Sequence, residues 1–410
     1  MYLTETHIIK QSKELDNLTF LCKNLYNKVN YVLRQEFINN GKYINKFDIF
    51  TLLKNDTDYK ALPSRVSRGV IRTLDGNWRG FFAAIKDYRT KPGKYLGKPN
   101  LPKYLNKRGK FNAIFMDTGI LKPFESKSNK KASNKKASRK GIGLSTLSMR
   151  INTRIPYQQI KEVNIKPLPT GKYKINIVYK HEEEKIKPNN NLYCSIDLGL
   201  NNLMTLTSNK PGLKPVLVNG RPLKSINQFY NKTRAKYQSE LPKGVFNSKK
   251  INKLTEKRGN KINDYLYKSV NFLIKWCLEN DLNTIVMGYN EGWKTEINIG
   301  KRNNQNFVGI PLEKLRWLNE YNSKLKGLNF GIHEEAYTSK CSFLDMEPVK
   351  FQENYVGERI KRGLFRSSDG SLINSDVNGS LNILRKAVPA AFANGIEGVA
   401  VHPERIKSFK

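Results

Sequence analysis

The sequence predicts a multidomain α+β protein, with helices and a small β-barrel-like domain in its N-terminal half and an α/β domain in its C-terminal half. Three observations support this prediction. The chain has 410 residues, which is typical of about two to four domains. Apolar residues follow helical spacing between Ser12 and Tyr88. From Leu192 to Val388, predicted strands alternate with predicted helices.

The charge composition indicates a protein that binds a polyanion. The sequence contains 73 Lys and Arg residues against 35 Asp and Glu residues, so the formal net charge is +38. Such an excess opposes compaction unless counter-charge is present. Nucleic acid supplies that charge, because phosphates neutralised by the protein release their counterions. A chain that is merely basic is the weaker interpretation.

The sequence predicts a protein of the prokaryotic cytoplasm, associated with the nucleoid. The first residues, MYLTETHIIKQSK, lack the apolar core of a secretion signal, and no apolar run reaches the roughly 18 residues of a membrane span. The four cysteines lie far apart and form no CxxC pair, which fits a reducing compartment. They are Cys22, Cys194, Cys277 and Cys341.

The N-terminal half reads as a helical recognition domain over residues 12–89. Residues Met1 to Lys10 alternate weakly and predict a strand before it. The last predicted helix, from Ser64 to Tyr88, carries four arginines away from its apolar face. They either contact a phosphate backbone or form a solvated face, and we favour the first interpretation. These arginines are Arg65, Arg68, Arg72 and Arg79.

A β-rich, wedge-like domain is predicted over residues 1–11 and 90–190. The segment that follows Thr90 is rich in Gly, Pro and Lys, which is typical of loops. The segment from Val163 to Tyr179 reads as a hairpin with its turn near Gly171. A basic loop over residues 124–142 contains NKKAS twice in tandem, and it either touches nucleic acid or is simply solvated.

The C-terminal half has the order of elements of an RNase H-like domain. Three strands are predicted in succession, followed by a long helical region broken near Pro242. A strand over NTIVMGYN, a helix over PLEKLRWLNEYNSKLKG, a strand over LNFGIHEE and a helix over SDVNGSLNILRKAV complete the order. We predict this domain over residues 191–340 and 372–390, with an insertion over 341–371 and a C-terminal tail over 391–410.

Two carboxylates occupy ends of elements that this order would bring together. Asp197 ends the first strand in a D-x-G-x-x-N arrangement with Gly199 and Asn202, and Asp376 begins the final helix. Taken alone, Asp197 could be a turn residue and Asp376 a helix N-cap. Phosphodiester hydrolysis by two Mg²⁺ ions, about 3.5–4 Å apart, requires carboxylates that converge from separate elements. Their joint placement favours this chemistry.

These residues resemble the TnpB family of insertion-sequence proteins, which are relatives of the type V CRISPR effectors. The resemblance rests on four blocks in order, SIDLGLNN, TIVMGYNEGWK, EEAYTSKCSFLD and LINSDVNGSLNILRKA, and it covers Leu192 to Val388. The segment RTLDGNWRGFF extends it weakly toward the N-terminus. The resemblance implies a RuvC nuclease domain, an N-terminal region that binds guide RNA and target DNA, and RNA-guided cleavage of double-stranded DNA.

The sequence departs from the family's pattern at the middle carboxylate. The family usually has a Glu at the end of the fourth strand, where this chain has Gly288. The fifth strand ends in Glu334 and Glu335, and a carboxylate on this neighbouring strand could reach the same metal. Successive strand residues point to opposite faces, so only one of the pair should face the site. We predict Glu335 or Glu334 as the displaced ligand, with Glu291 as a weaker candidate.

A second departure concerns zinc. The family often carries a four-Cys zinc module before the last block, where this chain has Cys341 alone. A single Cys cannot build a tetrahedral structural site, so we predict no structural zinc. The loop from Asp345 to Ser371 should then be held by packing of its apolar residues. These are Phe351, Tyr355, Ile360, Leu364 and Phe365.

The sequence therefore predicts an RNA-guided DNA endonuclease encoded by an insertion sequence. Asp197, Asp376 and Glu335 or Glu334 would hold two Mg²⁺ ions for hydrolysis. The guide RNA, derived from the transposon end, would select target double-stranded DNA by base pairing, and the protein would read only a short flanking motif. Basic residues leading to Asp376 would hold the scissile strand. They are Lys340, Arg359, Lys361, Arg362 and Arg366.

Two other functions stay open at this point. The first is a nuclease-inactive, RNA-guided DNA-binding repressor, which Gly288 supports and the pairing of Asp197 with Asp376 opposes. The second is a transposase that acts without RNA, for which the sequence offers no recombinase constellation. In the favoured interpretation, the protein is a monomer within a ribonucleoprotein.

Overall fold

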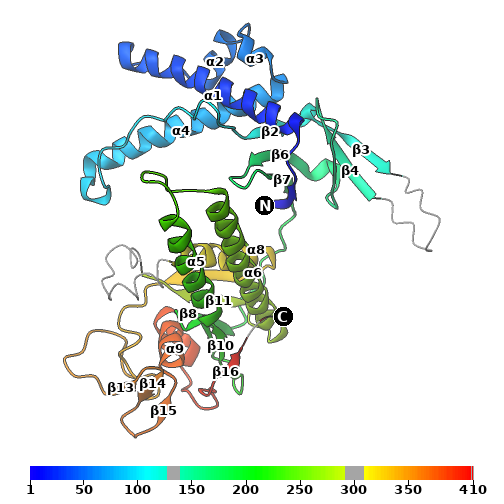
Figure 1. The fold of residues 1–410 in the computed structure, drawn as a ribbon. Helices are drawn as coiled ribbons and strands as arrows, with labels where there is room; N and C mark the ends of the chain where they lie inside the picture. The colour runs from blue at the N-terminus through cyan, green and yellow to red at the C-terminus, as the bar shows by residue number, and fades with distance from the viewer. Residues whose placement is uncertain (127–138, 291–308, 408, 410) are drawn as a thin grey trace. The chain divides into compact units, whose positions relative to one another are not determined.

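The computed structural model describes residues 1–126, 139–290, 309–407 and 409. The chain divides into two compact units, Met1–Glu182 and Glu183–Lys410, and each contains its own hydrophobic core (Figure 1). The multidomain α+β fold predicted from the sequence is confirmed. The predicted boundary between residues 190 and 191 lies eight residues beyond the boundary between the two units, and the finer domain ranges stay a prediction. None of the described helices has the length and apolar character needed to cross a membrane.

The helices of the first unit begin and end at local sequence signals. Ser12 caps the first helix by accepting a hydrogen bond from the Leu15 backbone N–H, and Gly41 ends it in the left-handed conformation that glycine adopts readily. Trp78 is fully buried, and its indole N–H donates to Asn30 at 3.1 Å. The predicted helical stretch is confirmed as α1 (Lys13–Asn40), α2 (Lys46–Leu52), α3 (Thr57–Lys60) and α4 (Ser64–Thr90).

Two antiparallel sheets complete the described part of the first unit. One has the order β1-β7-β6-β2 and includes the predicted hairpin, whose turn passes through Gly171 at a φ of 81°. The other has the order β3-β4-β5. The strands are β1 (Tyr2–Ile9), β2 (Ala113–Met116), β3 (Ile120–Ser126), β4 (Arg139–Leu144), β5 (Arg150–Asn152), β6 (Ile160–Pro167) and β7 (Tyr173–Lys180), with 3-10 turns η1 (Pro92–Lys94), η2 (Asp117–Gly119) and η3 (Tyr157–Gln159).

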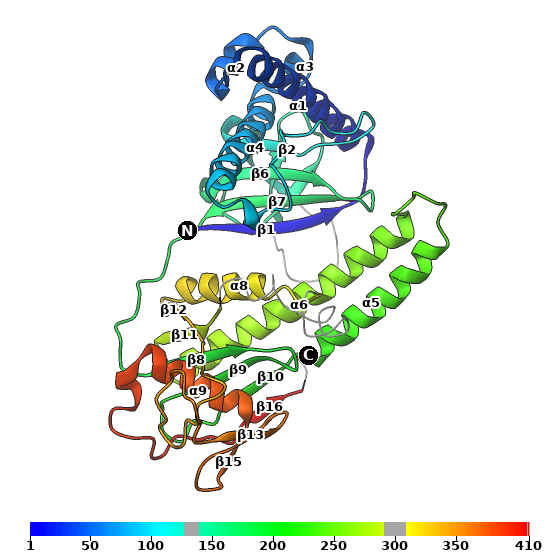
Figure 2. The same ribbon diagram turned by 90° about the vertical axis from the view of Figure 1, so that its left-hand side faces the viewer.

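One sheet forms the centre of the second unit (Figure 2). Its order is β12-β11-β8-β9-β10-β16, with β8, β11 and β12 parallel and β9 antiparallel to both of its neighbours. The predicted succession of strands is confirmed. The edge strand β16 comes from the predicted tail and pairs in parallel with β10. The strands are β8 (Tyr193–Leu198), β9 (Asn202–Ser208), β10 (Val216–Asn219), β11 (Thr284–Gly288), β12 (Asn329–His333) and β16 (Glu404–Ile406).

Helices cover both faces of this sheet. Side chains along β8 alternate between these two faces, and this alternation decides which face Asp197 occupies. Cys194 and Ile196 belong to the core formed with α6 and α8. Ser195 points to the other face, where it donates to the Ser380 backbone oxygen on α9 at 2.8 Å. Asp197, two residues later, therefore faces α9 as well. The helices are α5 (Arg221–Ser239), α6 (Lys249–Glu279), α8 (Leu312–Leu325) and α9 (Ser375–Ala387), followed by η4 (Pro389–Phe392).

The predicted insertion is attached to α9 by buried amide side chains. Asn378 and Asn382 both donate to the Cys341 backbone oxygen, at 2.8 and 2.7 Å. Phe365 is buried, but Phe351 is 64% exposed. The expected apolar packing is therefore present at Phe365, and hydrogen bonds from α9 add to it. The segment forms a small antiparallel sheet of β13 (Glu358–Lys361), β14 (Leu364–Arg366) and β15 (Leu372–Ile373).

Candidate active site

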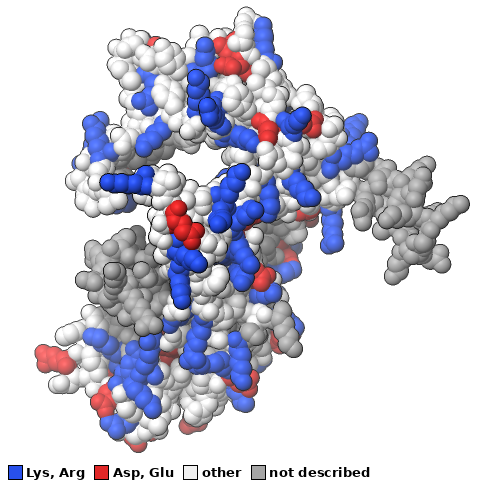
Figure 3. Space-filling model, viewed as in Figure 1, with Lys and Arg blue, Asp and Glu red and all other residues white. Residues whose placement is uncertain are grey.

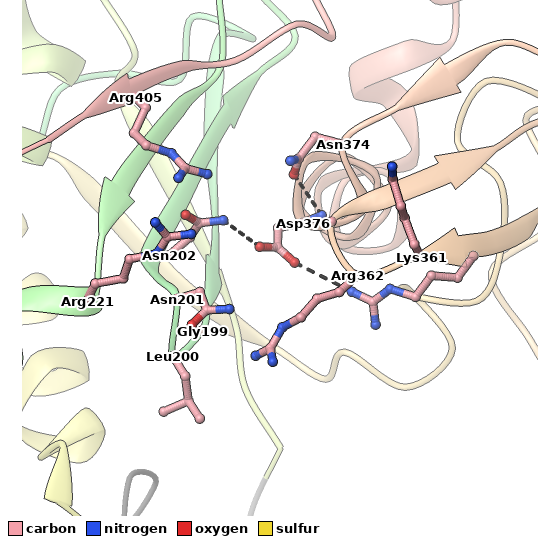
Figure 4. A pocket seen from close by; sticks show the side chains of 12 residues that line it. Gly199, Leu200, Asn201, Asn202, Arg221, Lys361, Arg362, Asn374, Asp376 and Arg405 are labelled. Carbon is pink, nitrogen blue, oxygen red and sulfur yellow. Dashed lines mark hydrogen bonds and ion pairs between the residues drawn. The ribbon is translucent and has the colours of Figure 1, made fainter. Parts of the chain in front are cut away.

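Asp376 lies in the first turn of α9, and its carboxylate is not the cap of that helix. The N-cap is Asn374, whose side chain accepts hydrogen bonds from the backbone N–H groups of Asp376 and Val377 at 3.0 and 3.3 Å. The alternative interpretation of Asp376 as an N-cap is therefore wrong. Its carboxylate instead accepts a hydrogen bond from Nδ2 of Asn202 at 2.6 Å and lies 3.7 Å from Nη2 of Arg359 (Figure 4).

Asp197 lies one residue before the end of β8. Gly379 of α9 passes close to it, since a Cβ atom at that position would lie 3.4 Å from Oδ2 of Asp197. Asp197 is half-buried, and desolvation of its carboxyl group raises the pKa well above the ordinary range. The negative charges of Glu335 and Asp376 raise the pKa further, while Arg359 lowers it. Glu335 and Asp376 are thus close enough to Asp197 to influence the ionisation of its carboxyl group.

Glu335 occupies space that a side chain at position 288 would need. Gly288 ends β11, and a Cβ atom built there would lie 2.8 Å from Oε2 of Glu335. Asn290 fixes the orientation of this carboxylate, because its Nδ2 donates to Oε1 at 3.2 Å while its Oδ1 accepts from the Glu335 backbone N–H at 3.4 Å. Burial raises the pKa of Glu335. The carboxylate of Glu335 therefore stands beside the position that the family usually fills with Glu.

The other two candidates for the displaced ligand differ from Glu335. The Glu334 side chain is 67% exposed, and its carboxylate forms an ion pair at 2.9 Å with Lys386 on the surface of α9. Glu291 lies outside the described residues. Between the two described candidates, the geometry favours Glu335.

The donor chemistry of Asp197, Glu335 and Asp376 fits Mg²⁺, which prefers oxygen ligands. In their present positions, no three His, Cys, Asp or Glu side chains among the described residues are close enough to share one metal ion. Asp376 is held by Asn202 and Arg359. A shared site thus requires these side chains to turn toward one another.

A basic pocket of about 640 Å³ lies beside Asp376. Three of the predicted strand-holding residues, Arg359, Lys361 and Arg362, line it. The other two lie elsewhere: Lys340 stands 5.6 Å from the ring centre of Tyr355, and Arg366 pairs with Glu358. Sequence reasoning did not single out two more lining cations, Arg221 and Arg405.

The arginines predicted on α4 belong to the first unit and have contacts within it. Arg72 pairs with Glu162 at 2.6 Å, and Arg79 pairs with Asp75 at 2.9 Å. Arg68 lies 5.6 Å from the ring centre of Phe50, and Arg65 is half-buried. Figure 3 shows that Lys and Arg side chains are distributed over the visible surface of both units, with fewer Asp and Glu. Binding of a phosphate backbone by α4 stays a prediction.

Asn202 holds the Asp376 carboxylate, and the sequence analysis named Asn202 without assigning it this role. It appears in the D-x-G-x-x-N arrangement, where its spacing from Asp197 places it at the start of the antiparallel partner strand. The hairpin then presents its amide to Asp376. An amide that follows a strand-end Asp at this spacing is a signal that could have identified it.

The sequence of this chain is similar to those of known proteins. Residues 176–294 match the OrfB_IS605 family model, described as "Probable transposase". The "TnpB-like protein ORF457" of Acidianus two-tailed virus is 25% identical over 416 residues, which cover 92% of this chain and 84% of that protein.

Two solved structures share the fold. The complex of Cas12f1 with sgRNA and target DNA has a TM-score of 0.58 at 16% identity and covers 90% of this chain and 81% of that chain. The mini-RNA-guided endonuclease CRISPR-Cas_phi3 has a TM-score of 0.51 at 10% identity, over 98% of this chain and 94% of that chain. The resemblance of this chain to the TnpB family is thus confirmed, and its fold is similar to the folds of these two solved proteins.

Proposed function

We propose that the protein is an RNA-guided DNA endonuclease encoded by an insertion sequence, which cuts target DNA next to a short flanking motif. The observation that carries the proposal is the convergence of Asp197, Glu335 and Asp376 from β8, the end of β12 and α9. Grouped carboxylates with desolvated members destabilise a metal-free fold, so a catalytic role explains them better than a structural one.

The carboxylates would hold Mg²⁺, which would activate the attacking water and stabilise the leaving oxygen in two-metal hydrolysis. Residues of this chain would orient the ligands. Asn202 holds Asp376, and Asn290 holds Glu335, through the hydrogen bonds described above. Mutation of groups that support metal ligands in this way typically lowers metal affinity or activity by roughly 10- to 100-fold. The basic pocket would hold the strand beside Asp376.

Guide RNA and target double-stranded DNA are the partners that we propose. The net charge of +38 supports a polyanionic partner, and the likeness to Cas12f1, solved with sgRNA and target DNA, supports this pair. The guide would select the target by base pairing, while the protein contacts the backbone of the heteroduplex. We expect one copy of the chain in each ribonucleoprotein.

Plasmid cleavage tests this proposal. The full chain, purified with RNA co-expressed from the transposon end, should cut a plasmid that carries the matching target in Mg²⁺. Asp197→Ala should abolish cleavage. Glu334→Ala removes an exposed carboxylate next to Glu335 and should leave cleavage intact. Cleavage that survives Asp197→Ala contradicts the assigned site, and cleavage without RNA favours the transposase instead.

A nuclease-inactive, RNA-guided repressor is the second candidate. Gly288 favours it, as does the separation of the carboxylates among the described residues. Such a protein would bind the matching target but would not cut it at any Mg²⁺ concentration. Measuring target binding and cleavage on the same preparation separates the two functions.

A further inference from the structure

The pocket beside Asp376 has two basic walls, and they come from distant parts of the second unit. One wall is formed by β13 and the turn that follows it. The other carries Arg221, the first residue of α5, and Arg405, in the C-terminal strand β16. Figure 4 shows the Asp376 carboxylate between the two walls. We call Arg221 and Arg405 the second wall.

Sheet pairing fixes Arg405 in the second wall. Strand β16 pairs in parallel with β10, with Arg405 in register with Leu217. The Glu404 backbone N–H donates to the Pro215 oxygen at 2.8 Å. Phe409 then packs near Tyr265, with ring centres 5.4 Å apart. The C-terminal segment is therefore built into the unit, and it presents Arg405 from an ordered strand.

The second wall carries charge that the described part of the chain does not neutralise. Both arginines are exposed, and no acidic side chain of the described residues lies within ion-pairing distance of either. The neighbouring Glu404 pairs with Lys214 at 3.2 Å. The pocket holds five cationic side chains and a single carboxylate. Such an arrangement is costly without an anion, and arginine matches phosphate with paired hydrogen bonds.

We propose that Arg221 and Arg405 bind phosphates of a single DNA strand, so that β16 forms part of the substrate site. The identity of the strand rests on the proposed function, which this inference deepens. A pocket of about 640 Å³ is the size of a small-molecule site, with room for about one or two nucleotides of one strand but not for a double helix. Cations on both sides of Asp376 would direct a phosphodiester past its carboxylate.

Strand binding without cleavage tests the second wall. The full chain with its bound RNA is titrated, without divalent ions, against a fluorescent, non-complementary DNA strand of about six nucleotides. Arg221→Ala and Arg405→Ala should each weaken binding about 5- to 20-fold and lower the slope of log Kd against log salt by about 0.7. Arg405→Lys keeps the charge and should recover most of the affinity.

Arg234 provides the matched control, because it is an exposed arginine on the same helix as Arg221 and lies outside the pocket. Arg234→Ala should change the affinity less than about twofold. In a second measurement, phenylglyoxal modification is mapped by mass spectrometry, and the strand should protect Arg221 and Arg405 but not Arg234.

Two results would overturn the inference: equal weakening by Arg234→Ala and Arg405→Ala, or full reactivity of Arg221 and Arg405 in the presence of the strand. Neither measurement depends on catalysis. A protein that binds the strand here but never cuts DNA keeps the inference and loses the proposed function. If the native protein cuts DNA but Arg405→Ala binds the strand normally, the proposed function is kept and this inference is lost.

Discussion

A Cβ atom on Gly288 would lie 2.8 Å from Oε2 of Glu335, closer than real Cβ atoms approach such a group. Glycine at the end of β11 is thus a condition for the present position of the Glu335 carboxylate. The parallel strands β11 and β12 are direct neighbours, with Gly288 in register with His333. The glycine at the end of β11 therefore leaves space for the carboxylate of Glu335, which lies just past the end of β12.

An exchange of these two positions tests their relationship. Glu335→Ala should reduce cleavage by at least about 100-fold, the upper end of the effect of residues that only support metal ligands. Restoring a carboxylate with Gly288→Glu on that background should recover part of the rate. Ile383→Val is added to relieve the contact of 2.4 Å that a Cβ atom would make with the Ile383 side chain. Normal cleavage by Glu335→Ala would exclude Glu335 as a ligand.

Asp16 should make the first unit sensitive to acid. Burial raises the pKa of Asp16, but hydrogen bonds from Lys110, Tyr173 and Gln11 outweigh it and leave the pKa lowered. A lowered folded pKa gives stability that is complete above the ordinary value of 3.8 and is lost as pH falls through the folded value. Asp16→Asn should lower the free energy of unfolding of this unit by about 1–2 kcal/mol at pH 7, which corresponds to a few degrees in Tm.

Calorimetry of the full chain checks the Asp16 prediction. The difference in Tm between native protein and Asp16→Asn should shrink as the pH is lowered below the ordinary pKa, because the unfolded chain then binds the proton first and the folded carboxyl group follows at its lower pKa. A difference that is constant from pH 7 to pH 3 would show that the effect is not linked to ionisation.

Much of the fold could be predicted because its signals are local. The apolar run that ends at Asp197 and the helical spacing of Leu25 and Val29 are visible within a few residues. The strands β13, β14, β15 and β16 could not be predicted in the same way. Each has two to four residues, too few for a periodic pattern, and β16 depends on pairing with β10 far earlier in the chain.

The residues of the candidate site could likewise be predicted only where a local sequence signal marks them. Asp197 and Asp376 could be selected because each lies at the end of an element in a recognisable order. Glu334 and Glu335 could not be separated, because β12 ends at His333 and strict alternation does not extend beyond it. Arg221 belongs to a wall that exists only after the sheet has formed, so no local pattern could identify it.

Asn382 should stabilise the segment that precedes Asp376 without any metal. Its side chain donates to the backbone oxygens of Thr338 and Cys341 at 3.0 and 2.7 Å and accepts from Arg385 at 2.8 Å. Asn382→Ala should cost about 1–3 kcal/mol, or roughly 3–10 °C in Tm. The exposed Asn354, in the same segment, serves as the control. A zinc chelator should leave the native Tm unchanged, and a large decrease would contradict the prediction of no structural zinc.

Arg359 should affect metal and DNA in opposite directions. Its guanidinium group lies 3.7 Å from Asp376 and lines the basic pocket, so it opposes a cation at the carboxylate while it attracts phosphate. A phosphate that draws Arg359 away would leave Asp376 free to bind Mg²⁺, which would couple metal binding to the arrival of the strand. Arg359→Ala should therefore lower the Mg²⁺ concentration for half-maximal cleavage several-fold and raise the KM for DNA about tenfold. Arg359→Lys should keep both values near those of the native protein. If Arg359→Ala weakened both metal and DNA binding, its contact with Asp376 would instead support the metal site, and the proposed coupling would be wrong.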